Sequence, residues 1–147
     1  MCHLCNYRNG TIAPPGNIII KNKYVTLTHI APPEGFPGWI LLYPARHVEK
    51  QTELTSEEKN KIVSIRWYCI EVLENLTKTD RVYEILFSEK TKHIHYHLIP
   101  RKNTVPDAFR GGRILEFRET YTEKEIAEFM TVFRERIISL AEFRDEQ

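Results

Sequence analysis

Short apolar segments separated by turn-forming residues recur along the first hundred positions of the chain. Apolar and β-branched runs bounded by Gly, Pro and Asn are typical of β-strands. Segments 9–16, 31–38 and 101–120 contain proline and glycine and are expected to be loops, the last long enough to be functional. The pattern predicts five strands, over residues 17–20, 24–30, 39–43, 81–87 and 93–99.

Two longer segments carry apolar residues at helical spacing, each behind a capping box. Thr55 and Glu58 stand in the Thr-x-x-Glu relation that caps a helix N-terminus, which predicts a helix over about residues 56–76. Thr122 and Glu125 repeat this relation before a second helix. The apolar face of that helix comprises Ile126, Phe129, Met130, Phe133, Ile137 and Leu140. Strands, a helix, two strands and a helix indicate an α+β domain built on an antiparallel sheet.

The bulk properties favour a single soluble domain. A chain of 147 residues is suited to one hydrophobic core, and 41% of its residues are hydrophobic and 28% charged. A net charge of +1 argues against an extended surface for nucleic acid or anionic membrane. The apolar runs are too short to span a bilayer, the N-terminus has no apolar signal core, and the three cysteines form no disulfide-dense pattern. We therefore expect a cytoplasmic protein without nucleic-acid or membrane partners.

Three of the six histidines alternate with apolar residues between positions 93 and 97. In a strand, alternate side chains share a face, so His93, His95 and His97 are expected to point the same way. Packing alone hardly explains such a cluster, since each buried imidazole needs hydrogen-bond partners. Two chemistries remain open at this point: binding of a metal such as zinc, and nucleophilic attack on phosphorus by a neutral imidazole.

The segment 93–101 resembles the signature of the histidine triad (HIT) superfamily, in which three histidines alternate with apolar residues. Segment 38–48, which contains Pro44-x-x-His47, is similar to the strand that precedes the signature in this family. The predicted helix lies between the two motifs, as it does in the family. The resemblance covers roughly residues 2–101, and we expect one HIT-like domain over residues 1–147, with an antiparallel sheet of about five strands and two helices.

The resemblance implies a nucleotide hydrolase or transferase that acts on the α-phosphate of a nucleotide conjugate, such as a dinucleoside polyphosphate or a nucleoside phosphoramidate. His95 corresponds to the family's nucleophile, which forms a nucleotidyl-histidine intermediate while a backbone carbonyl holds its Nδ1–H. His97 corresponds to the histidine that binds or protonates near the scissile bond. Members of the family usually form dimers, so the resemblance implies a homodimer that binds a purine nucleotide or nucleotide conjugate.

Several polar positions near the expected site differ from the usual family pattern. Residues 88–92 (SEKTK) replace a Gly-Gln-Ser/Thr run, so Ser88 or Thr91 is expected to hold the phosphate or the leaving group; an ordinary polar hairpin is the alternative. His29 stands where family members place a residue that holds the ribose hydroxyls. Trp39 replaces a histidine that often follows the glycine at the start of the preceding strand.

The chain begins with a Cys-x-x-Cys motif at Cys2 and Cys5. Alone, this motif fits a redox pair, a frayed terminus or half of a zinc site. Zinc-bearing bacterial HIT proteins join such a motif to the histidine of Pro-x-x-His and to the first triad histidine. The resemblance therefore implies a structural zinc held by Cys2, Cys5, His47 and His93, with His3 as the alternative ligand.

Two other functions remain open from the sequence. In one, the histidine cluster holds a catalytic metal, and the chain is a metal-dependent hydrolase. In the other, the chain binds nucleotides without turnover. A nucleotidyl-histidine adduct would argue against the first, and tight AMP binding without hydrolysis would identify the second.

Overall fold

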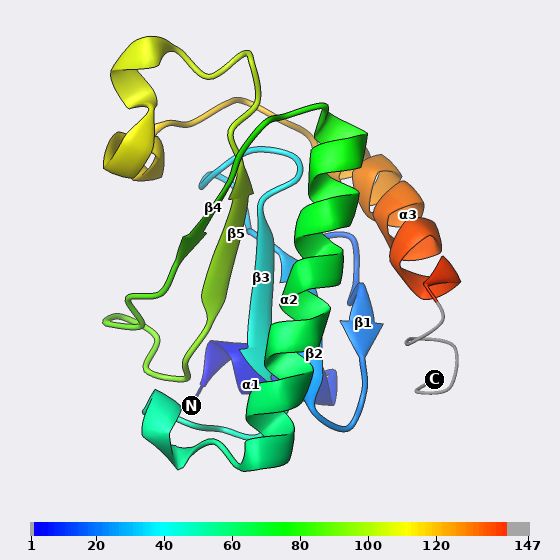
Figure 1. Ribbon diagram of the computed structural model, residues 1–147. Helices are drawn as coiled ribbons and strands as arrows, with labels where there is room; N and C mark the ends of the chain where they lie inside the picture. The colour runs from blue at the N-terminus through cyan, green and yellow to red at the C-terminus, as the bar shows by residue number, and fades with distance from the viewer. Residues whose placement is uncertain (1, 141–147) are drawn as a thin grey trace.

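The computed structural model describes residues 2–140, which form an antiparallel sheet flanked by helices (Figure 1). The five strands lie in the order β1-β2-β3-β5-β4, and all neighbours pair antiparallel. They are β1 (Ile20–Lys21), β2 (Val25–His29), β3 (Ile40–Pro44), β4 (Val82–Ile85) and β5 (Tyr96–Pro100). The expected α+β fold with a five-stranded antiparallel sheet is therefore confirmed.

Both predicted helices are present and begin at their capping boxes. In α2 (Ser56–Thr77) and α3 (Glu123–Ser139), the N-cap threonine and the glutamate three residues later bond each other's backbone N–H groups. α2 crosses one face of the sheet, and α3 packs beside it near β1 (Figure 1). Within residues 2–140, no helix is both long and apolar enough to cross a membrane.

A third helix, α1 (His3–Asn9), was not predicted from the sequence. It has seven residues and ends at Gly10, whose φ of 84° is the left-handed conformation that glycine adopts easily. Leu4 and Tyr7 of α1 are buried in the core. Arg8 fixes the helix to the sheet by donating to the Thr26 hydroxyl at 2.8 Å and to the backbone carbonyls of Asn22 and Val25. α1 is thus held by tertiary contacts, because a helix this short is not stable alone.

Alternation along β3 divides the core into two layers. Ile40 and Leu42 belong to the cluster that contains the buried faces of α2 and α3. Leu41 and Tyr43 belong to a second cluster, formed with α1 and the 101–120 loop. Because β3 is central and covered on both faces, all five of its residues are buried, which explains the continuous apolar run in the sequence.

The start of β5 differs from the sequence prediction. Pairing of β5 with β3 ends at Tyr96, and its pairing with β4 ends at His97. Before that point the chain turns to Val48, whose carbonyl accepts from the N–H of Ile94 at 2.8 Å. His93 and His95 therefore precede the strand, and the prediction that three histidines share one strand face is wrong. β1 is likewise displaced, lying at Ile20–Lys21 and not over 17–20.

Candidate functional site

Four side chains from three separate segments meet at the end of the sheet where β3 ends and β5 begins. We call Cys2, Cys5, His47 and His93 the metal cluster; their ligand atoms all lie within 4.8 Å of one another. Three Sγ to Nδ1 distances, Cys2–His93, Cys5–His93 and Cys5–His47, are each 3.5 Å. A tetrahedral zinc with Zn–S of about 2.3 Å and Zn–N of about 2.0–2.1 Å requires S···N edges of about 3.5 Å. The four residues therefore fit zinc.

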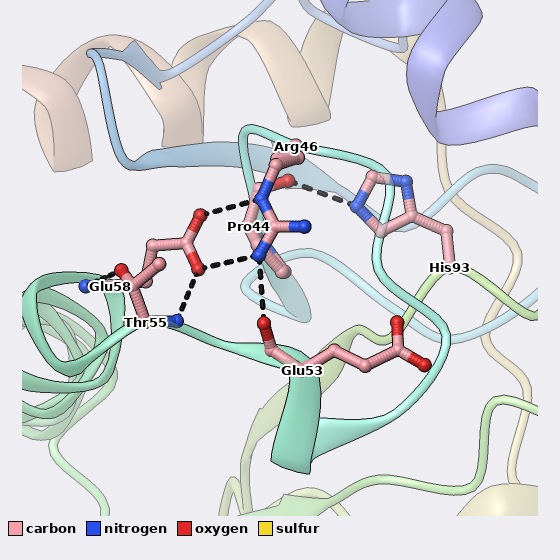
Figure 2. Close-up of polar contacts among 6 residues, drawn as sticks. All are labelled: Pro44, Arg46, Glu53, Thr55, Glu58 and His93. Carbon is pink, nitrogen blue, oxygen red and sulfur yellow. Dashed lines mark hydrogen bonds and ion pairs between the residues drawn. The ribbon is translucent and has the colours of Figure 1, made fainter.

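Backbone and carboxylate partners turn the two histidines of the metal cluster toward the thiols. The His93 ring is buried and bonds the Pro44 carbonyl through Nε2 at 2.9 Å (Figure 2). Its Nδ1 therefore faces the cysteines. His47 Nε2 lies 3.2 Å from Glu49 Oε1, and its Nδ1 likewise faces Cys5. Such partners fix the tautomer of a ligating histidine.

The segment that carries Pro44 and His47 is clamped to the start of α2. Arg46 makes two bonds of 3.0 Å to the carboxylate of Glu58 and donates to the Glu53 carbonyl at 2.9 Å (Figure 2). Glu58 is the capping-box residue of α2, so one carboxylate serves both the helix and the clamp. The guanidinium of Arg46 lowers the pKa of Glu58, which keeps this carboxylate charged.

Burial and neighbouring thiols set the protonation of the metal cluster. Burial lowers the pKa of His93 to about 4, so its ring is neutral at pH 7, as a metal ligand must be. Burial, with a contribution from Cys2, raises the pKa of Cys5 to about 11. Without metal the Cys5 side chain is therefore a thiol, and binding of a metal requires the loss of its proton.

His95 and His97, which we call the cleft pair, lie next to the metal cluster with ring centroids 5.0 Å apart. His95 Nδ1 lies 2.9 Å from the His93 carbonyl oxygen. A carbonyl only accepts, so Nδ1 carries a proton, and in the neutral ring Nε2 then has the free lone pair. His97 Nδ1 accepts a 2.9 Å hydrogen bond from the indole Nε1–H of Trp39. Burial, with a smaller electrostatic contribution from the neighbouring ring of His95, lowers the pKa of His97 to about 4.

A cleft of about 760 Å³ opens beside the cleft pair. It is enclosed by α1, the loop after β2, residues 87–91 and the 101–120 loop. Its apolar lining includes Leu4, Tyr7, Ile30, Leu41 and Leu115, and its charged lining comprises Glu34, Glu89, Lys90 and Arg118. An apolar wall with a few polar groups near reactive histidines is typical of a small-molecule site.

The comparison with protein families identifies the domain: the HIT domain profile matches residues 13–104. The chain belongs to the HIT family. This family binds nucleotides, and its fold is that of nucleotide-binding proteins and hydrolases. No curated protein sequence matches the chain.

Solved structures with this HIT fold cover nearly the whole chain. A hypothetical histidine triad nucleotide-binding protein from Sulfolobus tokodaii is 17% identical, with a TM-score of 0.73 over 95% of this chain and 93% of the other. A Zn-bound histidine triad family protein from Mycobacterium smegmatis is 19% identical, with a TM-score of 0.70 over 96% of both chains. A Hit-like protein from Bartonella henselae is 15% identical, with a TM-score of 0.69 over 92% and 95%. At these identities the likeness shows the fold.

The polar run before the triad of this HIT protein reaches the cleft. Ser88 accepts from the backbone N–H of His95 at 3.2 Å and lies 3.3 Å from its Nδ1. Thr91 and Lys90 line the cleft. Ser88 thus touches the histidine itself as well as the cleft, a contact that its place in the sequence did not indicate.

His29 has a different environment from the one the sequence suggested. Its side chain is fully buried, Nδ1 lies 2.8 Å from the Ile30 carbonyl, and Nε2 accepts from the Gly38 N–H at 2.9 Å. Both ring nitrogens are therefore used by the backbone of the loop between β2 and β3. His29 also belongs to the lining of the cleft, so its predicted contact with the ribose hydroxyls stays a prediction.

Sequence reasoning missed the walls of the cleft. Leu4 and Tyr7 reach it from α1, and His3 lines the cleft without joining the metal cluster. Leu115 and Arg118 come from the 101–120 loop, whose length was the one available signal. Trp39 differs from the usual histidine, but nothing in the sequence indicates its contact with His97.

Proposed function

We propose that this chain is a nucleotidyl hydrolase or transferase in which His95 attacks the α-phosphate of a nucleotide conjugate. The observation that carries the proposal is the bond from His95 Nδ1 to the His93 carbonyl. This bond holds the Nδ1–H, so that the neutral form of the ring presents its lone pair on Nε2 at the cleft. A neutral nucleophile approaches an anionic phosphate without charge repulsion.

The reaction proceeds in two displacements. The Nε2 lone pair of His95 forms a bond to the α-phosphorus, and the bond to the leaving group breaks. Water, or another acceptor, then attacks the phosphorus, the P–N bond to His95 Nε2 breaks, and its electron pair returns to Nε2. The proton of the attacking group passes to solvent, and the nucleotide is released or transferred. His97, Ser88, Thr91 and Lys90 line the cleft and are the groups we assign to binding the phosphates and the leaving group. A purine nucleoside would lie against the apolar lining.

Zinc, when bound, supplies a structural cross-link between α1 and the sheet. The four residues of the metal cluster provide a full tetrahedral set and leave no position for substrate or activated water. Within residues 2–140, His95 and His97 belong to no group of metal ligands. Free thiols suit a reducing compartment, and we place the protein in the cytoplasm.

Trapping of the intermediate tests the proposed function. Acid quench of the zinc-loaded protein with a dinucleoside polyphosphate labelled in the nucleoside should give labelled protein, with the nucleotide linked to His95. His95→Ala should give no label and should still bind AMP. Turnover without any adduct, or full activity of His95→Ala, would contradict the proposal, and AMP binding without turnover would identify a non-catalytic binding protein.

We also propose that the protein is a homodimer. Val63 and Trp67 are exposed on α2 (45% and 61%), and Phe87 follows the edge strand β4 with 62% exposure. α2 therefore carries exposed apolar surface, and Phe87 adds exposed apolar surface next to β4, which is an edge strand of the sheet. The aromatic residues Phe129, Phe133 and Phe143 of the C-terminal segment would, from the sequence alone, favour an interface through α3. In the structure Phe133 is buried and Phe129 packs against the core. Phe143 lies outside the described residues.

The oligomeric state tests the dimer. Light scattering at micromolar concentration should give twice the chain mass, and Trp67→Glu should give the mass of one chain. Val132→Glu, a change at an exposed apolar residue of α3, is the matched control and should leave the dimer intact. A parent protein that is monomeric and fully active would contradict the proposal.

A further inference from the structure

The indole of Trp39 is held rigidly at the start of β3. Trp39 is 3% exposed, and its ring packs edge-to-face on Phe36 with centroids 5.5 Å apart. The loop from β2 closes over it so tightly that a Cβ on Gly35 would lie 2.8 Å from the indole, and Gly35 has a φ of 68°. The Trp39 carbonyl also accepts from the Ile30 N–H at 2.9 Å. Little freedom remains for the indole to turn away from its neighbours.

This rigid indole meets one specific atom of the cleft pair. Trp39 Nε1 lies 2.9 Å from His97 Nδ1. An indole N–H donates and never accepts, so His97 Nδ1 must present its lone pair. A neutral imidazole carries one proton, and in His97 that proton is consequently on Nε2.

We infer that Trp39 is a positioning residue that locks His97 in its neutral Nε2–H form, so that His97 donates a hydrogen bond to the leaving group but does not give up a proton. The inference rests on the proposed function for the identity of the reaction. Trp39 acts only through His97 and touches no reacting atom.

The burial of His97 supports the same conclusion. Its low pKa of about 4 keeps the imidazolium form scarce at pH 7. A second proton would have to enter at Nδ1, where it would meet the indole N–H and break the bond to Trp39. Loss of the single Nε2 proton from a neutral ring would create an imidazolate, which is far too basic to form at pH 7. His97 therefore keeps its proton through the reaction.

A fixed donor of this kind selects the chemistry of the leaving group. When His95 Nε2 bonds to the α-phosphorus, the electron pair of the breaking P–O bond stays on the leaving oxygen. A phosphate leaves as an anion that the His97 Nε2–H can stabilise without proton transfer. An alkylamine needs a proton on nitrogen before the P–N bond breaks, and His97 has none to give. The substrate class is thus a nucleoside phosphoanhydride, in preference to a nucleoside phosphoramidate.

Nitrogen NMR of the zinc-loaded protein tests the lock without any substrate. With ¹⁵N-labelled histidine at pH 7, and His97 assigned by comparison with His97→Gln, His97 should show a protonated Nε2 and an unprotonated Nδ1. Trp39→Phe removes the donor and should give a mixture of tautomers. Phe36→Leu loosens the packing around the indole but keeps its N–H, so it should preserve the parental tautomer. A protonated Nδ1 in the parent, or an unchanged tautomer in Trp39→Phe, would overturn the inference.

Kinetics with two substrates that share one nucleoside test the predicted preference for a phosphoanhydride over a phosphoramidate. The parent should hydrolyse a dinucleoside polyphosphate with a higher kcat/KM than the 5′-phosphoramidate of an alkylamine. In Trp39→Phe, kcat for the polyphosphate should fall about tenfold, because one hydrogen bond that orients the donor is lost. The ratio of the two kcat/KM values should narrow in the same variant, and a ratio that does not change would overturn the inference.

The two assays separate failure of the lock from failure of the proposed function. If His97 shows the expected tautomer but the protein turns over neither substrate, the proposed function is contradicted and the role of Trp39 in fixing the tautomer is not. If the protein turns over substrate through His95 but His97 is protonated on Nδ1, the proposed function is supported and the inference about Trp39 is contradicted.

Discussion

The metal cluster and the cleft pair both contain histidines, but their rings bond the backbone through different nitrogens. In His93, Nε2 bonds the Pro44 carbonyl and Nδ1 faces the thiols. In His95, two residues later, Nδ1 bonds the His93 carbonyl and Nε2 is left for the cleft. The backbone oxygen that each ring meets therefore decides which nitrogen is available for chemistry. Residue type and spacing alone do not contain this information.

The largest effect that separates the two regions should come from His95→Ala. We expect kcat to fall by about 10³-fold or more, the range seen when a nucleophile is removed from a catalytic unit. Zinc content and the unfolding midpoint should be the same as in the parent, because the His95 side chain is neither a metal ligand nor part of the hydrophobic core. Metal analysis and thermal unfolding on the same preparations check this. Loss of zinc in His95→Ala would contradict the separation of the metal cluster from the catalytic residues.

Cys5→Ser should have the opposite effects: loss of zinc and of stability, with little change in kcat. We expect the zinc to be lost and the unfolding free energy to fall by about 3–4 kcal/mol at free zinc of about 100–1,000 times the dissociation constant. kcat should change little, since the metal cluster has no open position for substrate. KM should rise, because α1 carries Leu4 and Tyr7 of the cleft wall.

Cys69→Ala is the matched control for the thiol. Cys69 is buried in the α2 layer of the core, so its removal should lower stability while zinc remains bound. If Cys5→Ser kept the fold but lost kcat completely, and kcat returned on metal addition to a chelated parent, a catalytic metal would be indicated.

The sequence was sufficient where local patterns decide the structure. The capping boxes at Thr55 and Thr122 placed two helices correctly, because their bonds lie within four residues. The apolar runs located the central strands. The short helix α1 was missed because it depends on contacts of Arg8 and Tyr7 with distant segments.

The candidate site was harder to predict for the same reason. Resemblance brought Cys2, Cys5, His47 and His93 together as a ligand set, and they do converge in the structure. The contact between Trp39 and His97 spans 58 positions and follows no motif. The buried environment of His29 depends on how the loop to Gly38 folds back, which local patterns do not specify.

Ser88 offers a smaller test, confined to the cleft pair. Its hydroxyl accepts from the His95 backbone N–H, and its φ of 52° lies in the left-handed region. Ser88→Ala should lower kcat by about tenfold through loss of one hydrogen bond, and zinc content should not change. Ser88→Gly removes the same hydroxyl while relieving the backbone, so it should show the same loss. Parental kcat in Ser88→Gly would assign the effect to the backbone.

The smallest expected effect concerns Arg46, which reaches the metal cluster only through the segment between Pro44 and His47. Arg46→Ala should lower zinc affinity by less than the roughly tenfold loss expected when a direct hydrogen-bond partner of a ligand is removed. kcat should not change. Arg46→Lys keeps the charge but not the paired bonds to Glu58, and it should fall between the parent and Arg46→Ala.

The pH dependence of the unfolding midpoint identifies which contact of Arg46 holds the segment between Pro44 and His47 in place. Arg46 lowers the pKa of Glu58 in the folded state below its unfolded value. A lowered carboxyl pKa stabilises the fold above the unfolded pKa, and this contribution disappears as the pH falls through the folded pKa. The difference in unfolding midpoint between the parent and Arg46→Ala should therefore be present at pH 7 and vanish in acid. A difference that persists after Glu58 is protonated would mean that the Glu53 carbonyl, and not the ion pair, holds the segment in place.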